Sequence, residues 1–338
     1  MNLSEEDFKQ EQKHLELTTK LLRENISNLA QDLYDNEEKQ QEFKKYIWDT
    51  KQELDPTEMK TILSNNDKEI EDLEMKAKYY RKLYKIQNNP YFGKITFEDD
   101  ESNKDIYIGL TYLTKNDENV IYDWRAPISS IFYDYEQGDA QYEAPGGIIK
   151  GFLHNKRQFT IEDSKIKRVF DSKLTIQDEM LQEVLSRKNN DYMKNIVNTI
   201  QTEQNAIIRN IKDKNVIVQG IAGSGKTSVA LHRIAFLLYK IKNLTSDKVL
   251  IFAPNHIFSE YISNVLPELG EENTKETTFS DFLETYITEY KHIESFTSFI
   301  ERYYKDDCEY LNLIKFKQSN AIISVLEKYI EEYTSKAV

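Results

Sequence analysis

The stretch Val216–Leu238 reads VIVQGIAGSGKTSVALHRIAFLL and decides the fold of the second half of the chain. It predicts a strand over 215–218, a loop over 220–227 and a helix over 227–239. The loop matches the pattern G-x-x-x-x-G-K-[ST] in full. In such a loop, glycines let backbone N–H groups turn towards phosphates, and the helix N-terminus behind them favours negative charge. The stretch therefore predicts a site for a nucleoside triphosphate.

The polar residues of this loop have separate predicted roles. Lys226 is expected to neutralise the β- and γ-phosphate oxygens, and the Thr227 hydroxyl to ligate the Mg²⁺ that accompanies ATP. These two are the candidate catalytic residues, Thr227 is the candidate metal ligand, and ATP and Mg²⁺ are the expected cofactors. The candidate cofactor-binding residues in the loop are Gly220, Ala222, Gly223, Ser224, Gly225, Lys226, Thr227 and Ser228.

The sequence after the loop extends this prediction. KVLIFA at 248–253 predicts a second buried parallel strand, so that a doubly wound α/β core is expected. Residues 271–338 contain neither glycine nor proline, which favours helix. We assign 173–279 to the first part of a RecA-like P-loop domain and 280–338 to the start of a helical insertion.

Composition excludes several classes of protein. The chain has 338 residues, of which 39% are hydrophobic and 30% charged, as in soluble globular proteins. It shows neither an apolar run long enough for a membrane span nor a basic, then apolar N-terminus, which predicts a cytoplasmic protein with no membrane partner. A single cysteine excludes an internal disulfide. The net charge of −13 argues against a surface that coats nucleic acid.

Residues 1–88 predict two long helices, over 4–54 and 57–88. In the first, Phe8, Leu15, Leu22, Leu29 and Phe43 recur on a seven-residue spacing after a capping box at Ser4 and Asp7. In the second, Asp55 is the expected N-cap and Pro56 the first helical residue. An apolar seam follows at Met59, Leu63, Asn66, Ile70, Leu73, Ala77, Tyr80 and Tyr84.

The tight turn between these helices favours an antiparallel hairpin over residues 23–88, which makes a projecting arm. Residues 4–22 have no partner of matching length and are expected to lie along the body. The acidic residues at the turn, Glu53, Asp55 and Glu58, are the candidate partner-binding tip. A coiled coil that dimerises is the alternative.

Residues 89–172 predict a small β-rich domain, an antiparallel sheet or barrel. Short apolar–polar alternations are separated by turn residues such as Asn116-Asp117 and Pro145-Gly146-Gly147. Asp123-Trp124-Arg125-Ala126-Pro127 is interpreted as a packed structural knot in preference to a binding surface. The predicted fold is thus α+β and multidomain: a long antiparallel helical hairpin arm, a β-rich domain, and a partial P-loop α/β domain with the start of a helical insertion.

The motifs resemble those of a known family. Ile200-Gln201-Thr202-Glu203-Gln204 looks like the Q motif of superfamily 1 helicases, and GIAGSGKT followed by HRIAFLL resembles motif I of UvrD and Rep. Ala253-Pro254-Asn255 and Thr278–Phe282 stand where motifs Ia and Ib are expected. The helical arm followed by YDWRAPISSIFYDYE and QYEAPGG is similar to the HelD family, helicase-like ATPases of Gram-positive bacteria that recycle RNA polymerase.

The resemblance implies an ATPase in which Gln204 reads the adenine edge. It also implies an arm that inserts into the secondary channel of the RNA polymerase core, and a monomer that uses ATP to release polymerase from nucleic acid. No run of four apolar residues followed by Asp-Glu occurs after Gly225, so motif II is missing. We therefore expect an N-terminal part of a longer helicase-like protein, inactive by itself in ATP hydrolysis.

Two other functions remain open. The first is a DNA helicase of the helicase IV or UvrD type that translocates on single-stranded DNA and contacts single-stranded or duplex DNA. The second is a non-catalytic coiled-coil scaffold that binds polymerase or itself. The intact Lys226 and Thr227 disfavour the scaffold, and the acidic net charge disfavours a dedicated DNA binder.

Overall fold

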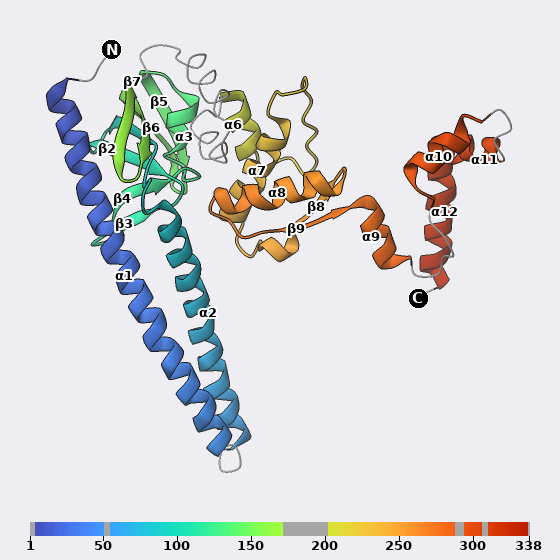
Figure 1. Ribbon diagram of the computed structural model, residues 1–338, viewed down its shortest axis with the longest axis horizontal. Helices are drawn as coiled ribbons and strands as arrows, with labels where there is room; N and C mark the ends of the chain where they lie inside the picture. The colour runs from blue at the N-terminus through green and yellow to red at the C-terminus, as the bar shows by residue number, and fades with distance from the viewer. Residues whose placement is uncertain (1–3, 51–54, 172–201, 288–293, 306–309, 337–338) are drawn as a thin grey trace. The chain divides into compact units, whose positions relative to one another are not determined.

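The computed structural model describes residues 4–50, 55–171, 202–287, 294–305 and 310–336. The chain divides into two compact units, Met1–Thr278 and Phe279–Val338. The first holds two long helices, a mixed β-sheet and an α/β segment, which Figure 1 labels. In the second, the described residues form the helices α9 (Phe279–Tyr286), α10 (Phe296–Tyr303), α11 (Leu311–Lys317) and α12 (Ala321–Lys336).

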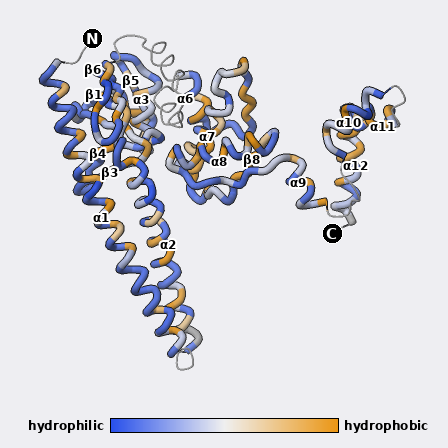
Figure 2. Tube along the Cα trace, viewed as in Figure 1, coloured by the Kyte–Doolittle hydropathy of each residue, from blue (hydrophilic) through white to orange (hydrophobic). Residues whose placement is uncertain are grey.

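The chain begins with α1 (Glu5–Thr50) and α2 (Pro56–Ile86). The N-cap half of the predicted capping box is present, because the Asp7 N–H donates to Ser4 Oγ at 3.1 Å; the Asp7 carboxylate in turn accepts from the Ser4 hydroxyl at 2.7 Å. Both helices are mostly hydrophilic with apolar residues at intervals, as Figure 2 shows. An ion pair of 2.5 Å between Asp32 and Lys76 joins α1 to α2 well beyond the sheet.

The sheet contains seven strands in the order β3-β4-β2-β1-β6-β5, with β7 also paired to β6. Their bounds are β1 Gly93–Asp99, β2 Asn103–Gly109, β3 Leu113–Lys115, β4 Glu118–Asp123, β5 Gly138–Ala144, β6 Gly147–Glu162 and β7 Lys165–Asp171. The predicted turn at Asn116-Asp117 joins β3 to β4, with φ of 51° and 65°. The prediction of a purely antiparallel sheet is wrong at one pair, because β2 and β4 run parallel.

Two hydrophobic clusters hold these elements together. One lies between one face of the sheet and the sheet-proximal parts of α1 and α2, and includes Leu15, Leu22, Leu83, Tyr91 and Phe159. Leu15 and Leu22 are 1% and 0% exposed, and each such burial stabilises by roughly 1.5–3 kcal/mol. The first part of α1 therefore lies along the body, as expected. The other cluster joins the opposite side of the sheet to the α/β segment.

The α/β segment comprises α6 (Thr202–Arg209), α7 (Lys226–Lys240), β8 (Leu250–Ala253), α8 (His256–Glu268) and β9 (Lys275–Thr278). The predicted parallel strand at 248–253 corresponds to β8, which pairs in parallel with β9, but Leu250 and Phe252 are 41% and 49% exposed instead of buried. β9 occupies part of a stretch for which we predicted helix.

The predicted strand over 215–218 is wrong, since these residues adopt no strand. A strand exists only where a neighbouring strand completes its backbone hydrogen bonds. Within the described residues neither β8 nor β9 pairs with this segment, and the Ile217 side chain is 95% exposed.

In the described part of the chain, no helix is both long and apolar enough to cross a membrane.

Candidate functional site

The loop before α7 is shaped by its glycines. Gly223 and Gly225 have φ of 81° and 77°, in the left-handed region that residues with a side chain adopt at a cost. Gly225 is the N-cap of α7, and its carbonyl accepts from the Val229 N–H at 2.9 Å. A Cβ atom on Gly220 would lie 2.6 Å from Ser224 Oγ, so a larger residue there requires the Ser224 side chain to move. The local sequence therefore forces a tight loop that ends at a helix N-terminus.

Lys226 lies across this loop. Its Nζ donates to the carbonyl oxygens of Gly220 at 3.1 Å and Ile221 at 2.6 Å. The ammonium group is thus held inside the curve of the loop by neutral acceptors. A phosphate oxygen is a stronger acceptor for an ammonium than a carbonyl is, because the hydrogen bond is then charge-assisted on both sides. The donors present, one ammonium and the first N–H groups of α7, fit a polyphosphate.

Thr227 and Ser228 occupy the first turn of α7 and are half-buried, whereas Ala222 and Ser224 are exposed in the loop. The Thr227 hydroxyl is placed at the helix N-terminus, where a Mg²⁺ ion bound to ATP would reach it. In the described part of the chain, no group of three or more His, Cys, Asp or Glu side chains is arranged to hold a metal. The residues fit a metal that arrives with the nucleotide and supplies charge neutralisation there.

The His232 side chain forms a hydrogen bond with the backbone of Ser228. The Ser228 carbonyl lies 2.7 Å from His232 Nδ1, and because a carbonyl only accepts, Nδ1 carries the proton. His232 is completely buried, and this burial lowers its pKa to about 4. The imidazole is therefore neutral at neutral pH and fixes the first turn of α7 as a hydrogen-bond donor.

Gln204 comes to the loop from α6. Its Nε2 atom lies 3.4 Å from the position that a Cβ atom on Gly225 would take. The side chain is half-buried. The structure thus brings together the phosphate loop and the glutamine proposed to read the base, although they are far apart in the sequence.

The acidic tip residues are not brought together in the described residues. Glu53 lies outside them, as does the side chain of Glu58. Asp55 is exposed and precedes α2, where its carbonyl accepts from the Met59 N–H at 2.8 Å. The tip therefore stays a prediction.

The structural interpretation of residues 123–127 is confirmed. Trp124 and Arg125 are 0% and 1% exposed. The Arg125 guanidinium donates to both carboxylate oxygens of Asp123, at 2.8 and 2.6 Å, and it forms a further ion pair with Glu271. The Arg125 side chain also lies over the Tyr239 ring of α7, 4.7 Å from its centroid. This knot joins the sheet to the α/β segment.

Sequence reasoning missed the residues that hold α6. Arg209 donates to backbone carbonyls of the knot, and Asn205 donates to Asp134. Nothing in the pattern of an ordinary amphipathic helix identifies either residue. The Asp-Trp-Arg sequence at 123–125 was the one feature of the sequence that pointed to a packed contact here, because Trp and Arg are large side chains next to a carboxylate.

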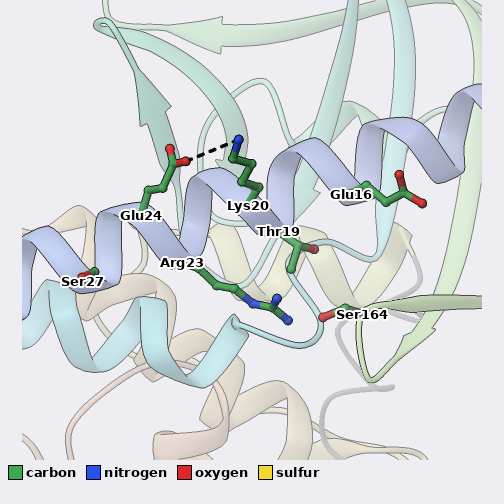
Figure 3. Close-up of a pocket in the computed structure, with 7 residues that line it drawn as sticks. All are labelled: Glu16, Thr19, Lys20, Arg23, Glu24, Ser27 and Ser164. Atoms are coloured by element: carbon green, nitrogen blue, oxygen red, sulfur yellow. Dashed lines mark ion pairs between the residues drawn. The ribbon is translucent and has the colours of Figure 1, made fainter.

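A cavity of about 470 Å³ lies elsewhere, between α1 and the β6–β7 turn. Figure 3 shows Arg23 pointing towards Ser164 while Lys20 pairs with Glu24. Its charged lining residues are Glu16, Lys20, Arg23 and Glu24, two of each sign. Because these charges cancel, the cavity offers no net attraction for phosphates. The loop at Gly220 is the better candidate for a nucleotide site.

One comparison with known protein families gives a match over the first part of the chain. A family model described as the N-terminal domain of DNA helicase IV HelD matches residues 8–190. A search of curated proteins found no match. The matched range covers most of α1, all of α2 and the seven-stranded sheet, and it ends before the loop at Gly220.

Proposed function

Because the chain belongs to the HelD family, whose N-terminal domain covers more than half of its 338 residues, we propose that it is the N-terminal part of a helicase-like ATPase. ATP binds at the loop of Gly220–Thr227, with Lys226 on the β- and γ-phosphates and Thr227 on the accompanying Mg²⁺. The observation that carries the proposal is the position of Gln204 beside Gly225, at the end of a loop that holds Lys226.

The α/β segment is proposed to be the first part of a RecA-like domain. The parallel pair β8–β9, with α7 and α8 beside it, supports this proposal. The roles of the residues follow from their chemistry: the N–H groups from Ala222 to Ser228 bind phosphate, and Gln204 selects adenine. Hydrolysis also needs a carboxylate that orients water, as in motif II, which these residues do not supply. The chain alone is therefore expected to bind ATP without turning it over.

We propose further that α1 and α2 form an antiparallel hairpin arm that binds the RNA polymerase core. The Asp32–Lys76 ion pair between the helices supports the hairpin. At about 1.5 Å per residue, the 31 residues of α2 span roughly 45 Å, long enough to reach into a channel. In the whole protein, ATP then drives the release of polymerase from nucleic acid, in the cytoplasm where that partner is found.

Translocation on DNA is the second candidate function, because the matched family model is described as a DNA helicase. The net charge of −13 supports the polymerase function over it, since DNA binding draws on clustered cations. A coiled-coil scaffold without ATP binding is the third. Capture of purified polymerase core, compared with capture of single-stranded and duplex DNA, distinguishes the first two.

The ATP site is tested by the Lys226→Ala variant. We expect the purified chain to bind a fluorescent ATP analogue in the presence of Mg²⁺, and the variant to bind it at least tenfold more weakly, because the loop loses its one fixed cation (roughly 1.5–3 kcal/mol for a charged hydrogen bond). In the full-length protein the same variant is expected to abolish ATP hydrolysis. Equal affinity of the two proteins for the analogue would favour the scaffold.

A further inference from the structure

The helix that carries Gln204 is too short to be stable without contacts to the rest of the protein. α6 has eight residues, Thr202–Arg209, and an isolated helix of that length is unstable in water. Its position must come from contacts outside the helix. One contact is to the helix of the phosphate loop, where Arg233 Nη1 donates to the Ile207 carbonyl at 2.6 Å. The others come from the sheet domain.

Hydrogen bonds from α6 to residues 124–134 run along its whole length. At its start, the Thr202 hydroxyl donates to the Tyr133 carbonyl at 3.0 Å. In the middle, Asn205 Nδ2 donates to Asp134 Oδ1 at 2.7 Å. At its end, Arg209 donates to the carbonyls of Trp124 at 2.6 Å, Arg125 at 3.1 Å and Ala126 at 3.3 Å. Figure 1 shows α6 beside α3 (Ser130–Asp134) of the sheet domain, and α6 also packs on α7.

Backbone carbonyls of residues 124–126 converge on the Arg209 guanidinium and hold it by hydrogen bonds. Burial lowers the pKa of Arg209, yet an arginine stays protonated at neutral pH because its ordinary pKa is above 12. Within the described residues it has no carboxylate in ion-pair distance: its Nε donates to Asn205 Oδ1 at 3.0 Å, and its two terminal nitrogens donate to three successive carbonyls. Those carbonyls converge because residues 123–126 form a turn, in which the Ala126 N–H donates to the Asp123 carbonyl at 2.9 Å. The Asp123–Arg125 ion pair closes that turn.

The Asn205 contact sets the rotation of α6 about its axis. Asn205 is 0% exposed, and its amide is anchored to the Asp134 carboxylate. Neighbouring residues of a helix are about 100° apart around the axis. With Asn205 fixed towards the sheet domain, Gln204 is turned towards Gly225, where its Nε2 lies. A rotation of α6 moves the Gln204 amide away from any base held at that place.

We propose that the sheet domain sets the base specificity of the nucleotide site, with Asp134 and Arg209 as positioning residues that act through α6 on Gln204. The inference rests on the proposed ATP site. It assigns residues 123–134 a role beyond packing: they form a platform outside the P-loop segment that holds the base-reading side chain in register with the phosphate loop. Disturbing the platform lowers discrimination between adenine and guanine while phosphate binding by Lys226 persists.

The test compares the affinities of the 338-residue chain for fluorescent ATP and GTP analogues with Mg²⁺. Asp134→Ala removes the acceptor of Asn205, and we expect it to lower ATP affinity roughly tenfold and to leave GTP affinity unchanged, because a buried amide is left unpaired. Gln204→Ala is expected to produce the same pattern directly. Asp134→Asn keeps an acceptor oxygen and is expected to restore the preference for ATP.

A matched control removes a carboxylate elsewhere in the sheet domain, at the end of β7. Asp171 accepts from Arg157 at 2.6 Å, away from α6, and Asp171→Ala is expected to keep the wild-type ratio of ATP to GTP affinity. If Asp134→Ala fails to fold, Thr202→Val removes one α6 bond with little change in shape, and it should reduce the ratio in the same direction.

The outcomes distinguish a failure of the proposed ATP site from a failure of the positioning role of Asp134 and Arg209. Equal binding of ATP by the wild type and by Lys226→Ala would remove the ATP site itself. With a Lys226-dependent site, an unchanged ratio of affinities in Asp134→Ala and Thr202→Val would overturn the positioning role alone. A wild-type chain that binds ATP and GTP equally would overturn it as well, since Gln204 would then not read the base.

Discussion

His232 shows at the scale of one residue how the loop depends on the protein interior. It lies one helical turn after Ser228 and holds the Ser228 carbonyl through Nδ1 at 2.7 Å. The ring of Trp124 lies edge-on to it, with the centroids 5.7 Å apart. Among the described residues, the other ring nitrogen, Nε2, has no hydrogen-bond partner. The imidazole thus sits in apolar surroundings that disfavour its charged form.

This burial predicts a loss of stability in acid. The pKa of His232 is lowered from 6.5 to about 4, so between those values the unfolded chain binds a proton that the folded chain does not. The free energy of unfolding therefore falls as the pH drops from 6.5 towards 4, by roughly 3 kcal/mol for this one group. Urea unfolding at pH 7 and pH 4.5 measures the effect, and His232→Gln should reduce the difference. Equal differences in both proteins would contradict the assignment.

At the scale of the element, α1 is attached to the sheet through a buried carboxylate. Glu11 is 2% exposed and accepts from Lys94 Nζ at 3.0 Å, Arg157 Nη1 at 2.6 Å and the Tyr107 hydroxyl at 2.8 Å. A helix of 46 residues that is mostly solvated needs such an anchor at its base. Charges brought together in this way stabilise only while every partner is present.

We expect Glu11→Ala to be strongly destabilising. It leaves the buried guanidinium of Arg157 with Asp171 alone and the Tyr107 hydroxyl without its acceptor, at a cost of about 3–5 kcal/mol. Chemical denaturation followed by circular dichroism measures the change. Lys20→Ala is the control, because its ion pair with Glu24 is 3.9 Å long and well exposed and should contribute less than about 1 kcal/mol. Similar costs for the two variants would refute the anchoring role of Glu11.

At the scale of the whole molecule, α2, the sheet and the α/β segment meet at Glu271. Its carboxylate accepts from Lys82 of α2 at 3.1 Å and also pairs with Arg125 of the knot. The neighbouring Glu272 pairs with Arg81 at 3.2 Å and with Lys78 at 3.5 Å. The basic face of α2 is therefore tied to the same knot that supports α6.

The proposed arm decides the function of the whole molecule. Replacing residues 33–75 by a short flexible linker removes the outer arm and leaves the buried Leu22 and Leu83 in place. The Asp32–Lys76 ion pair holds the two cut ends close together. We expect this protein to lose most of its binding to RNA polymerase core, measured by co-sedimentation, since the reach of the arm is lost.

A second variant distinguishes binding to RNA polymerase from an effect on polymerase catalysis. If the tip prediction holds, alanine at Glu53, Asp55 and Glu58 together should keep polymerase binding but lose any effect on polymerase catalysis, because carboxylates carried into a channel compete for a buried Mg²⁺. If the protein without the outer arm bound polymerase as tightly as the intact one, the DNA-helicase function would take precedence.

The sequence by itself determined the features that depend on near neighbours. The Ser4 cap, the start of α2 at Pro56, the turn at Asn116-Asp117 and the loop before α7 all follow from residues within one or two turns of each other. Of the seven-residue series in α1, Leu15 and Leu22 are buried, Leu29 and Phe43 are half-buried and Phe8 is exposed. The spacing did not show what covers the buried positions: Leu15 and Leu22 face the sheet cluster. A period identifies a face of a helix and carries no information about its partner.

The tertiary structure decided whatever depends on contacts between distant segments. Residues 215–218 have strand composition but form no strand, β2 and β4 pair in parallel, and α6 takes its orientation from Asp134 and the carbonyls of residues 124–126. The motif located the phosphate loop and the resemblance to superfamily 1 helicases named Gln204, whereas the contacts that hold α6 against the sheet domain required the fold. The physical reason is that strand pairing and buried hydrogen bonds are satisfied by groups far away along the chain, which no local pattern specifies.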